Sequence, residues 1–94
     1  MPTDYALEHN FPNPFNPDTA IRYAVPEASK VTLTIYNVLG QEIITLVNTH
    51  HLPGFFVTRW TGQDRLGRNV ASGIYLYRMT AGKFAKTHKM LLLK

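Results

Sequence analysis

Four histidines and six carboxylates are the side chains in this sequence that could hold a metal ion or move a proton. The histidines are His9, His50, His51 and His88. Neighbouring residues of an extended chain point in opposite directions, so His50 and His51 cannot both face one ion, and no structural zinc spacing appears. Asp64 is the only acid in the glycine-containing stretch after Trp60, whereas calcium needs several oxygen ligands. We therefore predict no metal and no cofactor.

The remaining reactive groups do not predict catalysis. The acids are scattered, no serine lies in a nucleophile elbow, and no glycine-rich phosphate loop follows a strand and opens a helix. The sequence has no cysteine, which excludes a disulfide framework, a thiolate metal site and a cysteine nucleophile. We predict that the protein is not an enzyme.

The charge of the chain is unevenly distributed around a formal net value of +4. Asp64 is the last acid, and every charged residue after it is basic: Arg65, Arg68, Arg78, Lys83, Lys86, Lys89 and Lys94. Such a strip can steer an acidic partner, a phosphate-bearing glycolipid or nucleic acid, or it can be a solvated face whose lysines discourage pairing at a sheet edge. We favour the solvated face. Nucleic acid is not predicted as a partner, because the basic residues are not interleaved with exposed aromatic rings.

Period-two alternation dominates the sequence and predicts strands rather than helices. In residues 30–36, Val31, Leu33 and Ile35 share one face, which should be buried, while the opposite face should be wetted. Gly40 is expected to supply a positive φ in a tight hairpin connection, residues 50–54 to form a loop, and residues 62–72 to form a longer one. The predicted strands are 5–7, 20–25, 30–36, 42–47, 55–60, 73–80 and 84–93. About seven strands indicate an all-β, immunoglobulin-like antiparallel sandwich, with residues 1–6 as an added start or linker and 7–94 as one domain.

Two groups of aromatic residues allow both a binding and a packing role. Phe11 and Phe15 lie in a proline-stiffened loop, where they present a recognition surface or plug the open end of the sandwich. Trp60, Tyr75 and Tyr77 form a platform for sugar stacking or point inward. We favour burial for both groups, because large aromatic rings gain most when buried.

The final predicted strand is unusual in its polarity. Residues 86–89 are polar on both faces, and residues 90–93 are apolar on both faces. Either neighbouring loops cover both faces of the end of this strand, or its apolar, lysine-flanked edge adds to the sheet or groove of a partner. An exposed final strand could also pair two copies of the chain.

The order of short motifs resembles the C-terminal sorting domains, type A, of passengers of the bacterial type IX (Por-type) secretion system. The resemblance runs from about Leu7 to Lys94, although Thr61 stands where the family commonly has aspartate. It is also similar to the related immunoglobulin-like domain of the flagellar hook-capping protein. The positions that carry the family motif are Pro12, Asn13, Pro14, Phe15, Tyr36, Gly40, Trp60, Gly62, Gly73 and Tyr75.

The resemblance implies an address domain at the end of a larger precursor, from which this chain would be a fragment. Its partners would be an N-terminal passenger, the outer-membrane translocon and a sortase-like peptidase, and the passenger would be secreted or anchored at the cell surface. Trimming residues 89–94 is expected to abolish export without unfolding the sandwich. The alternative is an accessory adhesion or carbohydrate-binding module of a secreted enzyme. Recognition by the translocon is assigned to the closing residues Lys86, Lys89, Met90, Leu91, Leu92, Leu93 and Lys94.

Overall fold

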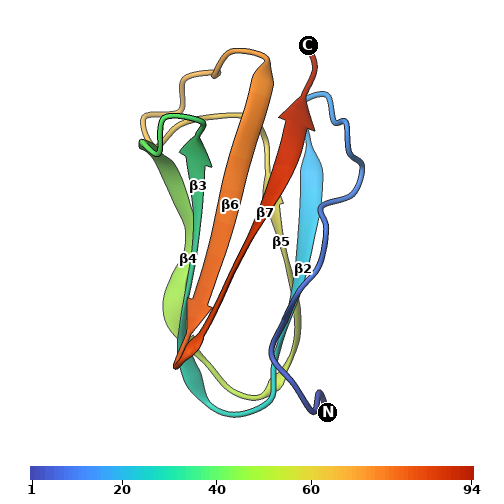
Figure 1. Cartoon of the computed structure of the whole chain (residues 1–94), viewed down its shortest axis with the longest axis vertical. Coiled ribbons are helices and arrows are strands. Elements are labelled where there is room, and N and C mark those ends of the chain that lie inside the picture. The colour runs from blue at the N-terminus through green and yellow to red at the C-terminus, as the bar shows by residue number, and fades with distance from the viewer.

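The computed structural model describes all 94 residues and contains strands without any helix (Figure 1). The predicted all-β class is therefore confirmed. No helix is available that could cross a membrane. The seven strands are β1 (Ala6–Leu7), β2 (Thr19–Val25), β3 (Ser29–Asn37), β4 (Glu42–His51), β5 (Gly54–Trp60), β6 (Gly73–Ala81) and β7 (Phe84–Leu92).

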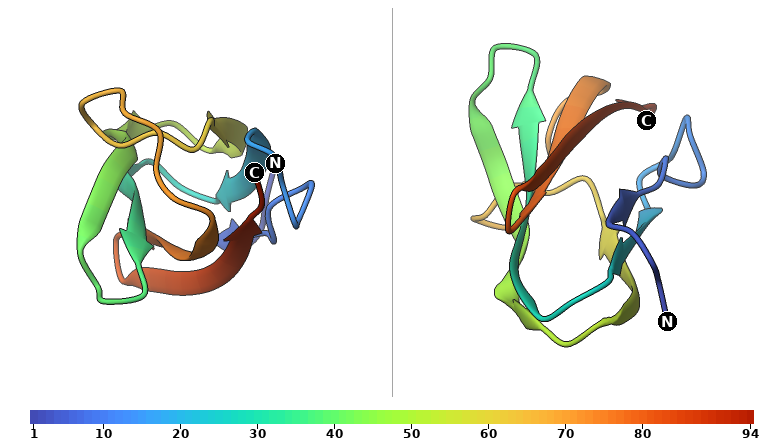
Figure 2. Two further views of the ribbon diagram at one scale, coloured as in Figure 1. Left: turned by 90° about the horizontal axis from the view of Figure 1, so that it is seen from above. Right: turned by 60° about the horizontal axis from the view of Figure 1, so that its bottom comes forward.

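The strands form two antiparallel sheets that face each other, as the end-on view in Figure 2 shows. One sheet has the order β1-β2-β5 and the other has the order β4-β3-β6-β7. The two hairpins, β3–β4 and β6–β7, lie in the larger sheet, so β7 forms one of its edges. The N-terminus and the C-terminus lie at opposite ends of the long axis (Figure 1). This two-sheet arrangement is an immunoglobulin-like sandwich.

The core lies between the sheets and is built from alternating residues of the strands, as the period-two pattern predicts. Val31, Leu33 and Ile35 of β3 are completely buried. They belong to one cluster with residues of the opposite sheet, such as Ile21 and Val25 of β2. Burying each such aliphatic side chain contributes about 1.5–3 kcal/mol. This continuous apolar layer holds β7 in place through its inward residues.

Two details of the predicted strands are wrong. β4 extends to His51 instead of ending at residue 47, so His50 and His51 lie in a strand and not in a loop. The His51 ring stabilises this extension, because its Nε2 lies 2.8 Å from the Tyr23 hydroxyl and its centroid 4.0 Å from that of Phe56. The outer face of β3 is also less wetted than predicted: Thr34 is buried and pairs with Thr45 at 3.2 Å. A central strand is shielded by side chains from both neighbours.

The β3–β4 hairpin has the local chemistry that the sequence predicts. Gly40 has a φ of 81°, a region that side chains with a Cβ rarely occupy. The Asn37 side-chain oxygen accepts hydrogen bonds from the backbone N–H groups of Leu39 and Gln41, both at 3.0 Å. Asn37, which lies just beyond the last β3–β4 pair, thereby closes the turn with its side chain.

Candidate interaction site on the closing strand

Most of the predicted motif residues gather at the end of the sandwich that also holds the C-terminus. We call this the motif end. The Phe15 and Trp60 ring centroids lie 5.7 Å apart, and those of Trp60 and Tyr75 lie 5.2 Å apart at a steep angle. Such edge-on and tilted arrangements are favoured by the ring quadrupoles. Gly62, with a φ of 74°, leaves space beside Pro17 and Leu92 that a Cβ would enter. Motif residues distant in sequence therefore pack into one structural unit.

The two phenylalanines of the proline-rich loop, residues 11–17, differ in burial. Phe15 is 2% exposed and plugs the motif end, as favoured by the sequence. Phe11 is 72% exposed, so the prediction that it is also buried is wrong. The reason is register: Phe11 exchanges backbone hydrogen bonds with Ala20, both at 2.9 Å. Ala20 alternates with the inward residues Thr19 and Ile21, so a residue paired with it projects to the outer face.

Two side chains that the sequence did not single out position this loop. Asn10 is buried, and its Nδ2 donates to the Thr19 hydroxyl at 3.0 Å and to the Pro12 carbonyl at 3.2 Å. The Thr19 hydroxyl also donates to the Pro12 carbonyl, at 2.9 Å. The signal available in the sequence was the tendency of asparagine to bond nearby backbone. It does not reveal that the partner is a strand residue.

Trp60, Tyr75 and Tyr77 all point into the core, which confirms the favoured interpretation and removes the sugar-stacking platform from the surface. Their polar atoms are satisfied internally. The Tyr75 hydroxyl donates to the Ala71 carbonyl at 2.6 Å, an arrangement like the tyrosine corner of immunoglobulin-like domains. The Tyr77 hydroxyl donates to the Glu8 carbonyl at 2.7 Å and so ties β6 to the other sheet. Burial raises the pKa of Tyr77 to about 12.

The apolar end of β7 is divided between the core and the surface. Met90 and Leu92 point inward and are fully buried, whereas Leu91 is half-buried and Leu93 is 47% exposed. Beyond Leu92, the chain leaves the β6 ladder. Because the opposite sheet covers only one face of this strand, alternation places Met90 and Leu92 on the covered face and Leu91 and Leu93 on the other. The sequence alone did not show which leucines that face takes.

The proline-rich loop covers the outer edge of β7 at its C-terminal end. Phe15 N–H donates to the Leu91 carbonyl at 3.0 Å, and Leu93 N–H donates to the Phe15 carbonyl at 2.9 Å. The Asn13 side-chain oxygen accepts from Leu91 N–H at 3.0 Å. Lys94 is also tied down, because its N–H donates to the Ser72 hydroxyl at 3.1 Å and its ammonium donates to the Val70 carbonyl. A loop therefore covers the edge of the strand at this end, but the predicted cover on both faces is wrong, because Leu91 is only half-buried and Leu93 is exposed.

These contacts correct the expected effect of trimming residues 89–94. Removing them would delete Met90 and Leu92 from the core and break the contact with Phe15, so the sandwich would lose stability. Of the residues assigned to recognition, Lys86, Lys89 and Leu93 have side chains on the surface of the folded domain, Leu91 is partly accessible, and Lys94 is exposed but hydrogen-bonded. Their role in recognition stays a prediction.

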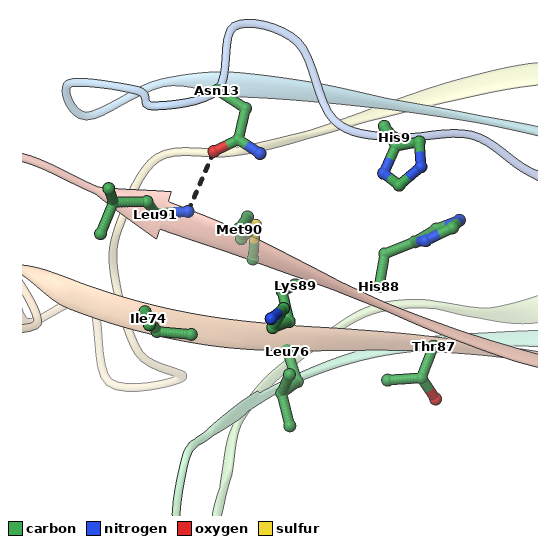
Figure 3. A pocket seen from close by; sticks show the side chains of 9 residues that line it. All are labelled: His9, Asn13, Ile74, Leu76, Thr87, His88, Lys89, Met90 and Leu91. Atoms are coloured by element: carbon green, nitrogen blue, oxygen red, sulfur yellow. Dashed lines mark hydrogen bonds between the residues drawn. The ribbon is translucent and has the colours of Figure 1, made fainter.

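A hollow of about 540 Å³ lies along the rest of β7 (Figure 3). We call it the β7 hollow. Ile74 and Leu76 form part of its apolar wall, and Lys89 brings a positive charge. His9 and His88 face each other at its far side, with ring centroids 4.1 Å apart, and His88 Nε2 lies 2.7 Å from the Leu7 carbonyl. The complete lining is His9, Asn13, Ile74, Leu76, Thr87, His88, Lys89, Met90 and Leu91.

The four histidines do not form one cluster. His51 packs against Tyr23 and Phe56, away from the pair formed by His9 and His88. No three or more His, Cys, Asp or Glu side chains lie together in an arrangement that could hold a metal ion. Asp64 uses its carboxylate to accept from the backbone N–H groups of Leu66 and Arg68, and the bond from Arg68 is the main cause of its lowered pKa.

The architecture defines an immunoglobulin-like domain, and comparison with known families identifies the family of such domains to which it belongs. The model of the FlgD Ig-like domain matches residues 17–83. The chain therefore belongs to the FlgD Ig-like domain family. A comparison with curated proteins gave no significant relative.

Three solved structures share the fold. Dimeric latent PorU from Porphyromonas gingivalis superposes with a TM-score of 0.75 at 22% identity and covers 96% of this chain. PorZ from the same organism, described as an essential surface component of the type IX secretion system, superposes with a TM-score of 0.66 at 18% identity and covers 95% of this chain. FlgD from Pseudomonas aeruginosa superposes with a TM-score of 0.62 at 19% identity and covers 79% of this chain. The chain spans only 9%, 12% and 57% of these three proteins, respectively.

Proposed function

We propose that this domain is a C-terminal sorting signal, which directs a larger passenger across the bacterial outer membrane through the type IX secretion system. The passenger would reach the medium or the cell surface after passing the periplasm, with processing by a sortase-like peptidase. The motif order and the fold shared with PorZ, a protein of that system, support this assignment over other roles of the same fold.

The placement of the termini suits such a signal. The N-terminus lies at the end of the long axis opposite to the motif end (Figure 1). A passenger joined before residue 1 would therefore leave the motif end and the outer side of β7 free. A translocon could engage these surfaces while the passenger remains at the other end.

The observation that carries the proposal is the arrangement of β7. Met90 and Leu92 anchor it in the core, while Lys86 and Lys89 remain exposed on the strand and Leu93 remains exposed directly after it. A cationic strand that is rigidly held but still presents side chains can be read by a partner without unfolding the domain. Recognition would then depend on these exposed residues and not on Met90 or Leu92.

The test is an export assay in a host with this secretion system. Residues 1–94 are fused to the C-terminus of an inert periplasmic reporter, and the reporter is measured in the medium and at the cell surface. A reporter that stays in the periplasm, with the domain folded, would refute the proposal.

A matched pair of double variants then locates recognition. Lys89→Glu with Leu93→Asp changes one exposed residue of β7 and the exposed residue directly after the strand, and we expect export to fall strongly. Lys30→Glu with Leu52→Asp makes the same chemical changes at exposed residues near the other end of the sandwich and should leave export intact. Equal losses in both pairs, in variants that remain folded, would remove β7 from the mechanism.

A further inference from the structure

The edge of β7 is only partly used by the fold. Leu91 directs both its N–H and its C=O away from β6, since both groups bond the proline-rich loop. The β6–β7 ladder runs without a bulge from Gly73↔Leu92 to Ala81↔Phe84. In an antiparallel ladder, alternate residues point their backbone groups to the same side. Lys89, Thr87 and Ala85 therefore also direct N–H and C=O outward.

These outward groups have no partner within the chain. β7 is the last strand of its sheet, and the backbone bonds outside the ladders involve Leu91 and Leu93 but not residues 85–89. Residues 85, 86, 87 and 89 are exposed. We call residues 85–89 the open edge. It is a free template for strand addition.

The fold already pairs one loop residue with this edge. Phe15 forms a parallel bridge with Leu92, and Asn13 supplies an acceptor beside it. The open edge continues directly from that covered stretch and borders the β7 hollow, whose wall includes Ile74, Leu76 and Thr87 (Figure 3). A strand laid on the open edge would place alternate side chains over this wall.

The charges around the open edge select the partner. Lys86 and Lys89 lie on it, Lys83 lies in the turn before β7, and Arg78 is paired with Thr87 on the neighbouring strand. No acid occurs after Asp64. The nearby Glu8 lines a different hollow beside Arg22. We propose that the open edge binds an extended acidic peptide of a partner protein as an eighth strand.

The same charges oppose pairing with a second copy of the chain. Two β7 edges in contact would bring Lys86 and Lys89 of both copies together, and like charges facing each other are destabilising. The inference deepens the proposed function and rests on it for its biological setting, because it assigns a partner chemistry to the strand that we assign to recognition.

The probe is a fluorescent, acetylated peptide in which glutamate and valine alternate along the sequence. Its binding to the purified chain is measured by fluorescence anisotropy. We expect saturable binding that weakens with salt. A peptide with lysine in place of glutamate, and an acidic peptide N-methylated at alternate residues, should not bind. Failure of the acidic peptide to bind, or equal binding of the N-methylated form, would overturn the proposal.

Variants of the open edge separate backbone pairing from charge. Thr87→Pro removes an outward N–H that the fold does not use and should weaken binding about five- to tenfold, while Thr87→Ala keeps the N–H and should change it less than about twofold. Lys89→Glu should weaken binding about three- to fivefold, against less than about twofold for Lys83→Glu. Equal effects within either pair, in folded variants, would contradict strand addition at this edge.

Two further outcomes also count against the proposal. Dimerisation on concentration that Thr87→Pro abolishes, without peptide binding, would identify a second copy as the occupant. Binding to phosphatidylglycerol vesicles without peptide binding would identify an anionic membrane surface. The export assay remains a separate test: peptide binding without export refutes only the sorting role, and export without peptide binding refutes only the acidic strand.

Discussion

The adjacent residues Leu92 and Leu93 allow a sharp test of how β7 is held. Leu92 is completely buried in the core cluster, whereas Leu93 is 47% exposed. Both are leucines in the terminal apolar run, so replacing either with alanine removes the same atoms. Any difference in stability must then come from their surroundings.

The expected magnitudes differ several-fold. Leu92→Ala leaves a cavity beside Gly62 and should cost about 3 kcal/mol, within the range for buried leucines. Leu93→Ala should cost less than about 1 kcal/mol, because much of its side chain already contacts water. A domain of this size has about 5–14 kcal/mol of stability in total. Leu92→Ala should therefore lower Tm by about 12–24 °C while leaving the domain folded at room temperature.

The assay is urea unfolding followed by the fluorescence of Trp60, the single tryptophan, which is buried next to Phe15. The midpoint should shift for Leu92→Ala with little change in the slope, which reports the surface exposed on unfolding. Equal destabilisation by the two variants would refute the inward and outward division of β7. It would also remove the argument that recognition uses the outward residues.

Three further predictions concern single features of the fold. Burial raises the pKa of Tyr77 to about 12, whereas an unfolded tyrosine titrates near about 10, so stability that is complete below pH 10 is lost as the pH rises towards 12. Tyr77→Phe should flatten this alkaline loss of stability in urea titrations, and Tyr23 and Tyr75, whose pKa values burial also raises, supply the remainder. Gly40→Ala should cost about 1 kcal/mol by calorimetry, since its φ of 81° strains a residue with a Cβ although nothing lies near enough to clash, and an unchanged Tm would contradict this cause. Asn13→Ala should lower the free energy of unfolding by about 1 kcal/mol and speed hydrogen exchange at Leu91 N–H. Asn13→Asp keeps the acceptor and should preserve the protection of that N–H. Equal exchange rates in the two variants would exclude the side-chain bond.

The strands were predictable because their signal is local. Alternation places Val31, Leu33 and Ile35 on one face wherever the strand lies, and Gly40 marks a turn because only glycine readily takes its φ. The extra length of β4 was missed because His50 and His51 have no strand-specific pattern of their own. The contact of His51 with Tyr23 comes from the opposite sheet.

The candidate site was predictable only in part. The sequence singled out Phe15, Trp60 and Tyr75, and the structure brings them together at the motif end. It did not separate Phe11 from Phe15, since both are phenylalanines in one proline-rich loop. The pairing of Phe11 with Ala20 decides that its ring faces outward.

The all-β class, the strand periods, the turns and a basic final third without acids follow from the order and the types of the residues alone. Each of these depends on neighbours within a few residues or on composition alone. Which part of β7 is covered and which part is open depends on how the two sheets and the proline-rich loop pack. That outcome depends on the bond between Asn13 and Leu91, which are 78 residues apart, and on closure of the sheets around Met90 and Leu92. A local pattern cannot encode such a contact, because its geometry exists only when both sheets have packed.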